Sequence, residues 1–574
     1  MKKLLLILLN TMLLVGCAPK QNIDETIKSD ELNIDYDIKL PTYFHYELND
    51  YPQRCSELVE NANKGVFDSS AYEKLFDEYK LISDLKETQY MIYSTDVTNT
   101  NESDEYLYIA LVLDEARDIF ASTCNKLTKS GVADKYKEYI NNDFIYNQFA
   151  KYNEKTQEEI DLLAKEDQLI NDYNNVSSKM YDYETTVNGE IYTFDDILSE
   201  KGDALYEKNQ DAYFAAYYDC LSNFNKDVGE IYLELVKIRD KIAKLNGYEN
   251  YALYMDENEY GRNYDISKLD TFKKVVKDYG EYIYYYISYF QDDNAIELSS
   301  EELLESAESV INQISPMAKG YYKLLRTVPG IYSIDKGDER YNGSFCTYLY
   351  SVPTGLYFLS ISDTTSDYFT LAHEFGHFIN ANRLITLNPT NENGSYDVYE
   401  FHSSAMEVLF SLKSQELLKE KWEPAFINNL IDKLYTVVFA CILDDFQRQV
   451  YENPNMNLGE INQLFYDICH SYGFYMNEYY WSLVPHNFDS PMYYMSYGVA
   501  YFSSLQLYEI AKKDYNKAIK IYEKIMDSDP CTKGYFEIMP EAGLETIDSQ
   551  RVVKNTLESI LETVNDAYVK YYDE

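Results

Sequence analysis

Two histidines, His373 and His377, lie four positions apart, and a glutamate, Glu374, follows the first of them. On a helix, positions i and i+4 share one face, so the two imidazoles can bind a single metal ion. Glu374 is then placed to act as general base for a water molecule on that metal. The spacing predicts a hydrolytic metal site. The alternative is a buried helix with two structural histidines.

A zinc ion held by two histidines needs a third protein ligand and keeps one position for water. A second helix is expected to start near Ser395 and to run toward Lys419, with Glu400 and Glu407 on one face. Both acids lie in a mostly uncharged stretch, where a buried carboxylate is costly unless it binds a metal or a donor. We expect Glu400 to be the third ligand and Glu407 to orient a ligand histidine, with a surface position as the alternative for Glu407. His402 points elsewhere on this helix and is expected to be structural.

Helical patterns surround these residues over most of the chain. Apolar residues recur at spacings of three and four from about 54 to 182. Asn188-Gly189 lies between alternating residues and predicts a β-hairpin with a type I′ turn over Thr185–Phe194. Further helical runs are expected at about 228–245, 266–290 and 300–326.

Short β-prone runs lie between Tyr341 and Ser362, just before the predicted metal helix. A small sheet there can offer an edge to an extended peptide, and we expect the strand around Leu356–Ser360 to do so. An ordinary connecting hairpin is the alternative. Because apolar residues flank His373 on both sides, the metal helix is expected to lie deep between helical lobes. A channel of this kind admits short unstructured peptides and excludes folded proteins.

The N-terminus has the features of a secretion signal. Lys2 and Lys3 precede an apolar run from Leu4 to Leu14, which is too short to span a bilayer. The sequence from Leu14 to Cys17 is similar to the lipobox of bacterial lipoproteins, which implies cleavage before Cys17 and lipidation of this residue. We therefore expect a lipid-anchored protein on the extracytoplasmic face of a bacterial cell membrane. An ordinary secreted chain is the alternative.

The composition is strongly acidic. Lys and Arg total 51 against 97 Asp and Glu, which gives a net charge of −46. Such acidity disfavours binding to nucleic-acid phosphates and favours solubility. The seven cysteines other than Cys17 include no C-x-x-C pair and are odd in number. We expect most of them to be buried small side chains, not ligands or a disulfide framework.

Taken together, several stretches resemble the thimet oligopeptidase and oligopeptidase F family of zinc metallopeptidases, and more closely its oligopeptidase F branch. They are Asp367–His377, Glu400–Glu407, Val228–Tyr251, Trp481–His486 and Ser490–Tyr497, and the resemblance spans about 195–560. It implies a mainly α, two-lobed, zincin-type fold with a small β-sheet next to the metal helix and a deep substrate channel. The expected segments are a signal peptide over 1–16, a lipidated tether over 17–45, an N-terminal helical domain over 46–184 and a catalytic domain over 185–574.

The resemblance also implies that His486 and a following tyrosine stabilise the oxyanion, a role that suits imidazole and phenol donors in a dry cleft. The candidates in order of preference are Tyr497, Tyr494 and Tyr493. The sequence departs from the family pattern at two places, which bear on substrate specificity and on the assignment of the oxyanion donors. Asn380 stands where many members carry a further histidine, and Asn487–Pro491 differs from the glycine-rich run of the thimet branch.

We expect a zinc-dependent endopeptidase, with one Zn²⁺ per chain, that hydrolyses short unstructured oligopeptides. His373, His377 and Glu400 are the expected ligands, and Glu374 is the expected general base. A zinc carboxypeptidase or dipeptidyl carboxypeptidase of the same fold is the alternative enzyme. A non-catalytic peptide-binding lipoprotein is the alternative from another class, and Glu374 argues against it because a binder needs no base beside the metal.

Overall fold

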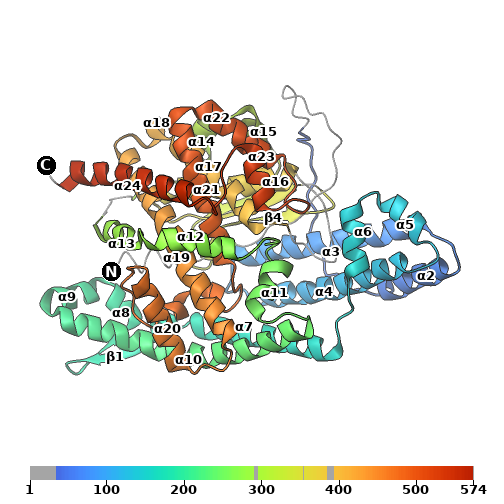
Figure 1. Cartoon of the computed structure of the whole chain (residues 1–574), viewed down its shortest axis with the longest axis horizontal. Helices are drawn as coiled ribbons and strands as arrows, with labels where there is room; N and C mark the ends of the chain where they lie inside the picture. Colours follow the sequence, from blue (N-terminus) through green and yellow to red (C-terminus); the bar gives the residue numbers. More distant parts are fainter. Residues whose placement is uncertain (1–33, 290–294, 353, 384–393, 573–574) are drawn as a thin grey trace.

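The computed structural model describes residues 34–289, 295–352, 354–383 and 394–572. The predicted signal peptide and Cys17 lie outside these residues. Helices make up most of the described chain and are accompanied by two small sheets (Figure 1). The predicted mainly α fold is confirmed.

Five helices, drawn in blue to cyan in Figure 1, form most of a smaller hydrophobic core that also includes Tyr348, Tyr350 and Ala381. They are α2 (Tyr51–Asn63), α3 (Ser69–Thr95), α4 (Thr100–Thr128), α5 (Ala133–Ile140) and α6 (Asp143–Lys151). Three of them begin at a side chain that accepts an N-terminal amide hydrogen, namely Asp68, Asn99 and Asn142. Such caps satisfy donors that a helix leaves unpaired at its start.

The next elements lie along one long side of the molecule and pack into the larger of its hydrophobic cores. They are α7 (Gln157–Ser177), η1 (Met180–Asp182), β1 (Glu184–Val187), β2 (Glu190–Thr193), α8 (Phe194–Leu198), α9 (Glu200–Lys208) and α10 (Gln210–Leu245). The predicted hairpin is confirmed, because β1 and β2 pair antiparallel. Asn188 and Gly189 have φ values of 53° and 86°, which a type I′ turn requires.

The two helical runs expected at 266–290 and 300–326 each divide into two helices. After α11 (Tyr251–Asn258) come α12 (Ser267–Lys277), α13 (Gly280–Tyr289), α14 (Ser300–Ile311) and α15 (Pro316–Thr327). Pro316 occupies the first turn of α15, and Ser315 accepts the amide hydrogen of Ala318. Proline has no amide hydrogen and therefore fits a helix start better than a helix interior.

A three-stranded sheet lies beside the predicted metal helix, in the order β3 (Tyr332–Asp335), β5 (Thr354–Ser360), β4 (Phe345–Leu349). Strand β5 pairs parallel with β3 and antiparallel with β4. The expectation that a peptide pairs with the edge of the strand around Leu356–Ser360 is wrong, because this strand is central. Strand β3 was not predicted, because its four residues carry too little periodicity to be recognised.

The remaining helices build the larger core around the site. They are α16 (Ser366–Arg383), α17 (Tyr396–Ser411), α18 (Gln415–Leu418), η2 (Lys419–Lys421), α19 (Trp422–Glu452), α20 (Leu458–Ser471), η3 (Tyr480–Leu483), η4 (Pro485–Asn487), α21 (Tyr494–Lys513), α22 (Tyr515–Met526), α23 (Tyr535–Ala542) and α24 (Gln550–Tyr572). Among the described residues, one helical stretch, Gln415–Glu452, is long and apolar enough to cross a membrane. Its most apolar window is 89% buried inside the protein, so we assign it to the core.

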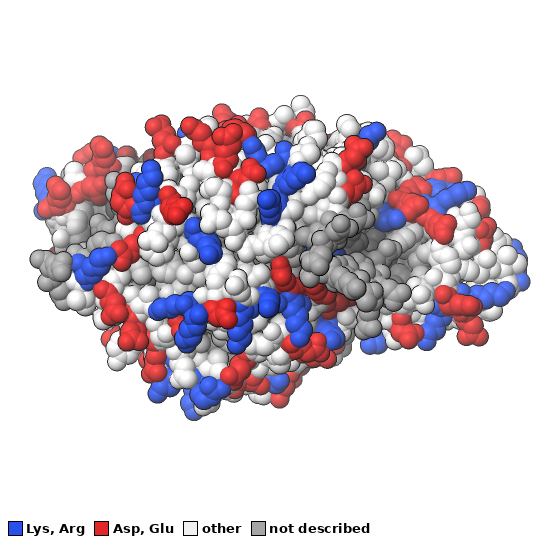
Figure 2. Space-filling model, turned by 90° about the horizontal axis from the view of Figure 1, so that it is seen from above, with Lys and Arg blue, Asp and Glu red and all other residues white. Residues whose placement is uncertain are grey.

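The cysteines and the surface charges are two further features of the side chains. The seven cysteines from Cys55 to Cys531 are buried and form no disulfide among the described residues, which confirms the expectation of buried thiols. Figure 2 shows acidic side chains interspersed with basic ones over the face seen from above, so on this face neither sign of charge gathers in a single field.

A buried carboxylate joins helix α3 to the turn between strands β4 and β5 of the three-stranded sheet. Asp84 of α3 accepts hydrogen bonds from the backbone amides of Tyr350 and Ser351, at 2.5 and 3.0 Å, in the turn between β4 and β5. Its side chain also accepts from the Ser351 hydroxyl. Burial raises the pKa of Asp84 to about 6, although these hydrogen bonds oppose the rise.

Asp84 should therefore make stability depend on pH. Its folded pKa of about 6 lies above the ordinary value of 3.8. Its stabilising contribution is therefore present below about pH 4 and is lost as the pH rises through about 6. The loss amounts to about 3 kcal/mol at most. The measurement is the free energy of unfolding from pH 4 to 7, taken as wild type minus Asp84→Asn. A difference that grows with pH would show that the hydrogen bonds outweigh the burial.

Candidate metal centre

Helices α16 and α17 cross in close contact at a glycine. A Cβ atom on Gly376 would lie 2.4 Å from the carbonyl oxygen of His402, so any larger residue would force the helices apart. Strand β5 supports the other side of α16, where the Tyr357 hydroxyl donates to the carbonyl oxygen of Leu371 at 2.8 Å. The contact at Gly376 brings the histidines of α16 next to Glu400 of α17.

The three predicted ligands lie together in the interior. His373, His377 and Glu400 are buried, and one ligand atom from each lies within 4.8 Å of the others. The Nε2 atoms of His373 and His377 are 3.7 and 3.6 Å from the same carboxylate oxygen, Oε2 of Glu400. Within the described chain, Nε2 of His373 has no hydrogen-bond partner.

The donor set fits a zinc ion. Zinc binds histidine nitrogen and carboxylate oxygen at about 2.0–2.2 Å, so tetrahedral ligand atoms lie about 3.4 Å apart. The observed separations from Oε2 of Glu400 are close to this value and too long for hydrogen bonds. Catalytic zinc sites use three protein ligands, whereas structural sites use four, so this set of three has the number typical of a catalytic site.

Glu407 orients the ring of His373 through its Nδ1 atom, the ring nitrogen that does not face Glu400. Its Oε1 lies 2.6 Å from Nδ1 of His373, so Nδ1 carries the hydrogen and Nε2 is left for a metal. Its Oε2 accepts hydrogen bonds from Lys433 at 2.7 Å and from Asn429 at 3.1 Å. Burial by itself would raise the pKa of Glu407, but Lys433 and His373 lower it to about 2.

Lys433 was not predicted from the sequence as part of this site. Its side chain is buried on α19, and its ammonium group lies 4.5 Å from the ring centroid of Tyr501. Its place in the mostly apolar stretch from Leu430 to Val438 was the available signal, because a buried lysine needs a partner. The partner, 26 residues away in the chain, could not be identified from spacing.

Replacing Lys433 by methionine should weaken metal binding. The change leaves the Glu407 carboxylate without its buried cation, so the ring of His373 is held less firmly. Loss of an outer partner of this kind typically costs about 10–100-fold in metal affinity. The measurement is zinc affinity by competition with a chromophoric chelator. Lys273→Met is the control, because Lys273 is a buried lysine that pairs with Asp444 and Asp445 instead. Equal affinities for wild type and Lys433→Met would contradict the role.

Glu374 lies on α16 beside the three ligands and is fully buried. Neither of its carboxylate oxygens has a hydrogen-bond partner among the described residues. Burial raises its pKa to about 8, while the nearby His377 lowers it. A carboxylate that is buried beside a metal site without a protein partner is available for a proton.

His486 and the three candidate tyrosines form one aromatic cluster. The ring of His486 lies 5.4–5.9 Å from the rings of Tyr493, Tyr494 and Tyr497. The Tyr493 hydroxyl donates to Oε1 of Glu400, which joins this cluster to the metal site. Burial raises the pKa of Tyr497 well above its usual value, so its hydroxyl keeps the proton that a donor needs.

Tyr501, a further residue that was not predicted from the sequence, extends this cluster toward α16. Its ring centroid lies 6.1 Å from that of Tyr497 and 6.4 Å from that of His373. It follows Tyr497 by one helical turn, and this spacing was the available signal.

His402 and Asn380 are both buried, and the backbone carbonyl of His402 accepts a hydrogen bond from Tyr522.

The fold and the site together define a mainly α body in which two histidines of an H-E-x-x-H helix meet a glutamate from the following helix. No family model matches the sequence. An oligoendopeptidase F homolog from Borreliella burgdorferi is 19% identical over 503 residues, which cover 79% of this chain and 84% of the relative.

Solved structures show the same fold. A putative oligoendopeptidase F superposes with a TM-score of 0.73 at 16% identity, over 91% of this chain and 98% of the other. PZ peptidase A with an inhibitor gives a TM-score of 0.72 at 17% identity, over 92% and 98%. A putative oligoendopeptidase F from Bacillus anthracis gives 0.70 at 17% identity, over 92% and 97%. The chain therefore has the fold of the oligoendopeptidase F structures.

Proposed function

We propose that this protein is a zinc-dependent endopeptidase that hydrolyses short, unstructured oligopeptides. The observation that carries the proposal is the buried group of His373, His377 and Glu400 with Glu374 beside it. The likeness to an oligoendopeptidase F homolog and to solved oligoendopeptidase F structures supports it.

In the proposed mechanism, His373, His377 and Glu400 would hold one zinc ion, which would supply a Lewis acid for peptide hydrolysis. Glu407 fixes the ring of His373. Glu374 accepts a proton from the attacking water and passes it to the leaving amine. His486 and Tyr497 donate hydrogen bonds to the oxygen that becomes negative as the carbonyl carbon turns tetrahedral.

The depth of the site supports a small, flexible substrate. The three ligands and Glu374 are each at most 6% exposed. A peptide bond must come close to these residues to react, and the backbone of a folded protein cannot do so without unfolding. We therefore propose oligopeptides as substrates and expect compact folded proteins to resist cleavage.

The test uses a peptide of about ten residues blocked at both ends, because an exopeptidase needs a free terminus. The metal-loaded wild-type protein is incubated with this peptide, with its unblocked form, and with folded and unfolded forms of one small protein. We expect internal cleavage of both peptides and of the unfolded protein. Cleavage restricted to the free carboxyl terminus would favour a carboxypeptidase or dipeptidyl carboxypeptidase. Cleavage of well-ordered sites in the folded protein would contradict the expectation that a folded backbone cannot reach the buried site.

We further propose that Cys17 carries a lipid anchor and places the enzyme on the extracytoplasmic face of a bacterial membrane. This proposal rests on the residues from Lys2 to Cys17. Detergent phase partitioning of the full-length protein expressed in a bacterium tests it. Wild type is expected in the detergent phase and Cys17→Ala in the aqueous phase. A Cys17→Ala chain that still partitions with detergent would exclude this anchor.

A further inference from the structure

Arg262 joins helix α17 to the start of helix α21. Its buried guanidinium donates to Asp256 at 2.7 Å and to the carbonyl oxygen of Met492 at 3.0 Å through Nη1. Nη2 donates to the hydroxyl of Ser496 at 2.8 Å, and Nε donates to Asp397 at 3.3 Å. One side chain therefore contacts α11, α17 and α21 together with the segment that precedes α21.

The contacts on α17 and α21 are adjacent to the proposed catalytic groups. Asp397 lies three residues before Glu400, on the same face of α17. Ser496 precedes Tyr497 and donates its hydroxyl hydrogen to Asp397 at 2.9 Å. Tyr264 donates to the other oxygen of Asp397 at 2.8 Å. We call this set of contacts among Arg262, Asp397, Ser496 and Tyr264 the junction. It fixes α17 and α21 against each other, next to the proposed ligand Glu400 and the proposed donor Tyr497.

Arg262 also holds an unusual backbone turn. Met492 has a φ of 69°, in the left-handed region that residues with a side chain rarely adopt. Such a conformation is costly and persists only when its surroundings fix it. The amide of Met492 donates to Gln447, and its carbonyl oxygen accepts from Arg262. The turn leads directly into Tyr493, whose hydroxyl donates to Glu400.

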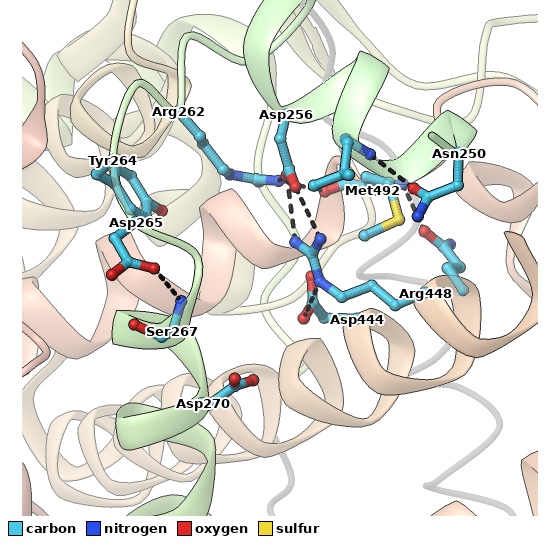
Figure 3. A network of polar contacts seen from close by, with 12 residues as sticks. Asn250, Asp256, Arg262, Tyr264, Asp265, Ser267, Asp270, Asp444, Arg448 and Met492 are labelled. Atoms are coloured by element: carbon cyan, nitrogen blue, oxygen red, sulfur yellow. Dashed lines mark hydrogen bonds and ion pairs between the residues drawn. The ribbon is translucent and has the colours of Figure 1, made fainter. Parts of the chain in front are cut away.

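The junction is one end of a buried ionic network. Figure 3 shows Asp256 between the guanidinium groups of Arg262 and Arg448. Arg448 pairs in turn with Asp444 at 2.9 Å, and Lys273 pairs with Asp444 at 2.8 Å. Lys273, on α12, is therefore a second buried cation of this network, and its ion pairs are with residues of α12 and α19.

We propose that Arg262 is a positioning residue that sets the places of Tyr493 and Tyr497 relative to the metal ligand Glu400. The inference rests on the proposed function, since it assigns these groups their roles. Without Arg262, the left-handed turn and the contact between α17 and α21 lose their common support. A shift of about 1 Å between reacting groups can lower turnover about 10²-fold.

The test compares Arg262→Met with Lys273→Met. Both changes replace a buried cation of one network by an apolar side chain of similar length, so both are expected to lower the unfolding temperature. For Arg262→Met we expect kcat on the end-blocked peptide to fall about 10²-fold while KM changes less than about threefold. For Lys273→Met, kcat should stay within about threefold of wild type.

A second readout does not depend on turnover. Cobalt(II) substituted for zinc has visible absorption bands that report ligand geometry. Arg262→Met should alter these bands, because Tyr493 no longer holds Glu400 in place, and Lys273→Met should leave them unchanged. If Arg262→Met fails to fold by circular dichroism, Ser496→Ala removes one contact of the same junction. It should then change kcat and the cobalt bands in the same direction, by a smaller factor.

The outcomes separate the two proposals. Equal losses of kcat in Arg262→Met and Lys273→Met would overturn the positioning role, because both would then reflect stability. Unchanged cobalt bands and kcat in Arg262→Met, or in Ser496→Ala where that variant is needed, would also overturn it. If wild type binds cobalt but cleaves no peptide, the proposed function fails. The cobalt bands of the variants then still decide whether Arg262 positions Glu400.

Discussion

Glu374→Gln is expected to bind one zinc per chain and to cleave peptides about 10²–10⁴-fold more slowly than wild type. Glutamine keeps the size of the side chain and one acceptor oxygen, but it cannot take the proton of the attacking water. Because neither carboxylate oxygen of Glu374 has a hydrogen-bond partner among the described residues, the amide breaks no contact of the fold and should be tolerated. The measurements are zinc content by atomic absorption and kcat/KM on the end-blocked peptide.

Glu400→Ala is the matched variant, because it removes a buried carboxylate from the same site but takes a metal ligand with it. It should lose both zinc and activity. Normal turnover in Glu374→Gln would place the base elsewhere. Stoichiometric zinc in Glu400→Ala would remove Glu400 from the ligand set, and Glu407 would be tested next.

Tyr497→Phe is expected to lower kcat about 10²–10³-fold with little change in KM, the effect typical of losing one oxyanion donor. The phenylalanine ring preserves the packing against His486 and Tyr494, so the loss isolates the hydroxyl. Steady-state kinetics on the end-blocked peptide measure the effect.

The neighbouring tyrosines serve as controls for this assignment. Tyr493→Phe removes the hydroxyl that donates to Glu400, so it should weaken zinc binding in addition to lowering turnover. Tyr494→Phe should remain close to wild type. If Tyr494→Phe loses turnover and Tyr497→Phe does not, the donor is Tyr494.

The grouping of the three proposed ligands could be predicted in part, because their places on two helices follow from local periodicity. His373 and His377 share a helical face by spacing alone, and Glu400 and Glu407 stood out as acids in an apolar helix. The close crossing of α16 and α17 at Gly376 brings the histidines of α16 and the glutamates of α17 together in one site.

The contacts that support this site could not be predicted, because they join residues far apart in the chain. Arg262 is 135 residues from Asp397 and 234 from Ser496. Lys433 reaches Glu407 from another helix. In the same way, strand order depends on long-range pairing, so β5 was expected at an edge although β3 covers it. Periodicity identifies helices and faces, but it does not say which faces meet.

The most direct test of the central claim follows bound zinc and peptide cleavage in the same sample of wild-type protein during a chelator titration. We predict one zinc per chain at the start, a cleavage rate that falls in proportion to the zinc removed, and recovery when zinc is returned. Cleavage that persists after the zinc has been removed would contradict a zinc peptidase centred on His373, His377 and Glu400.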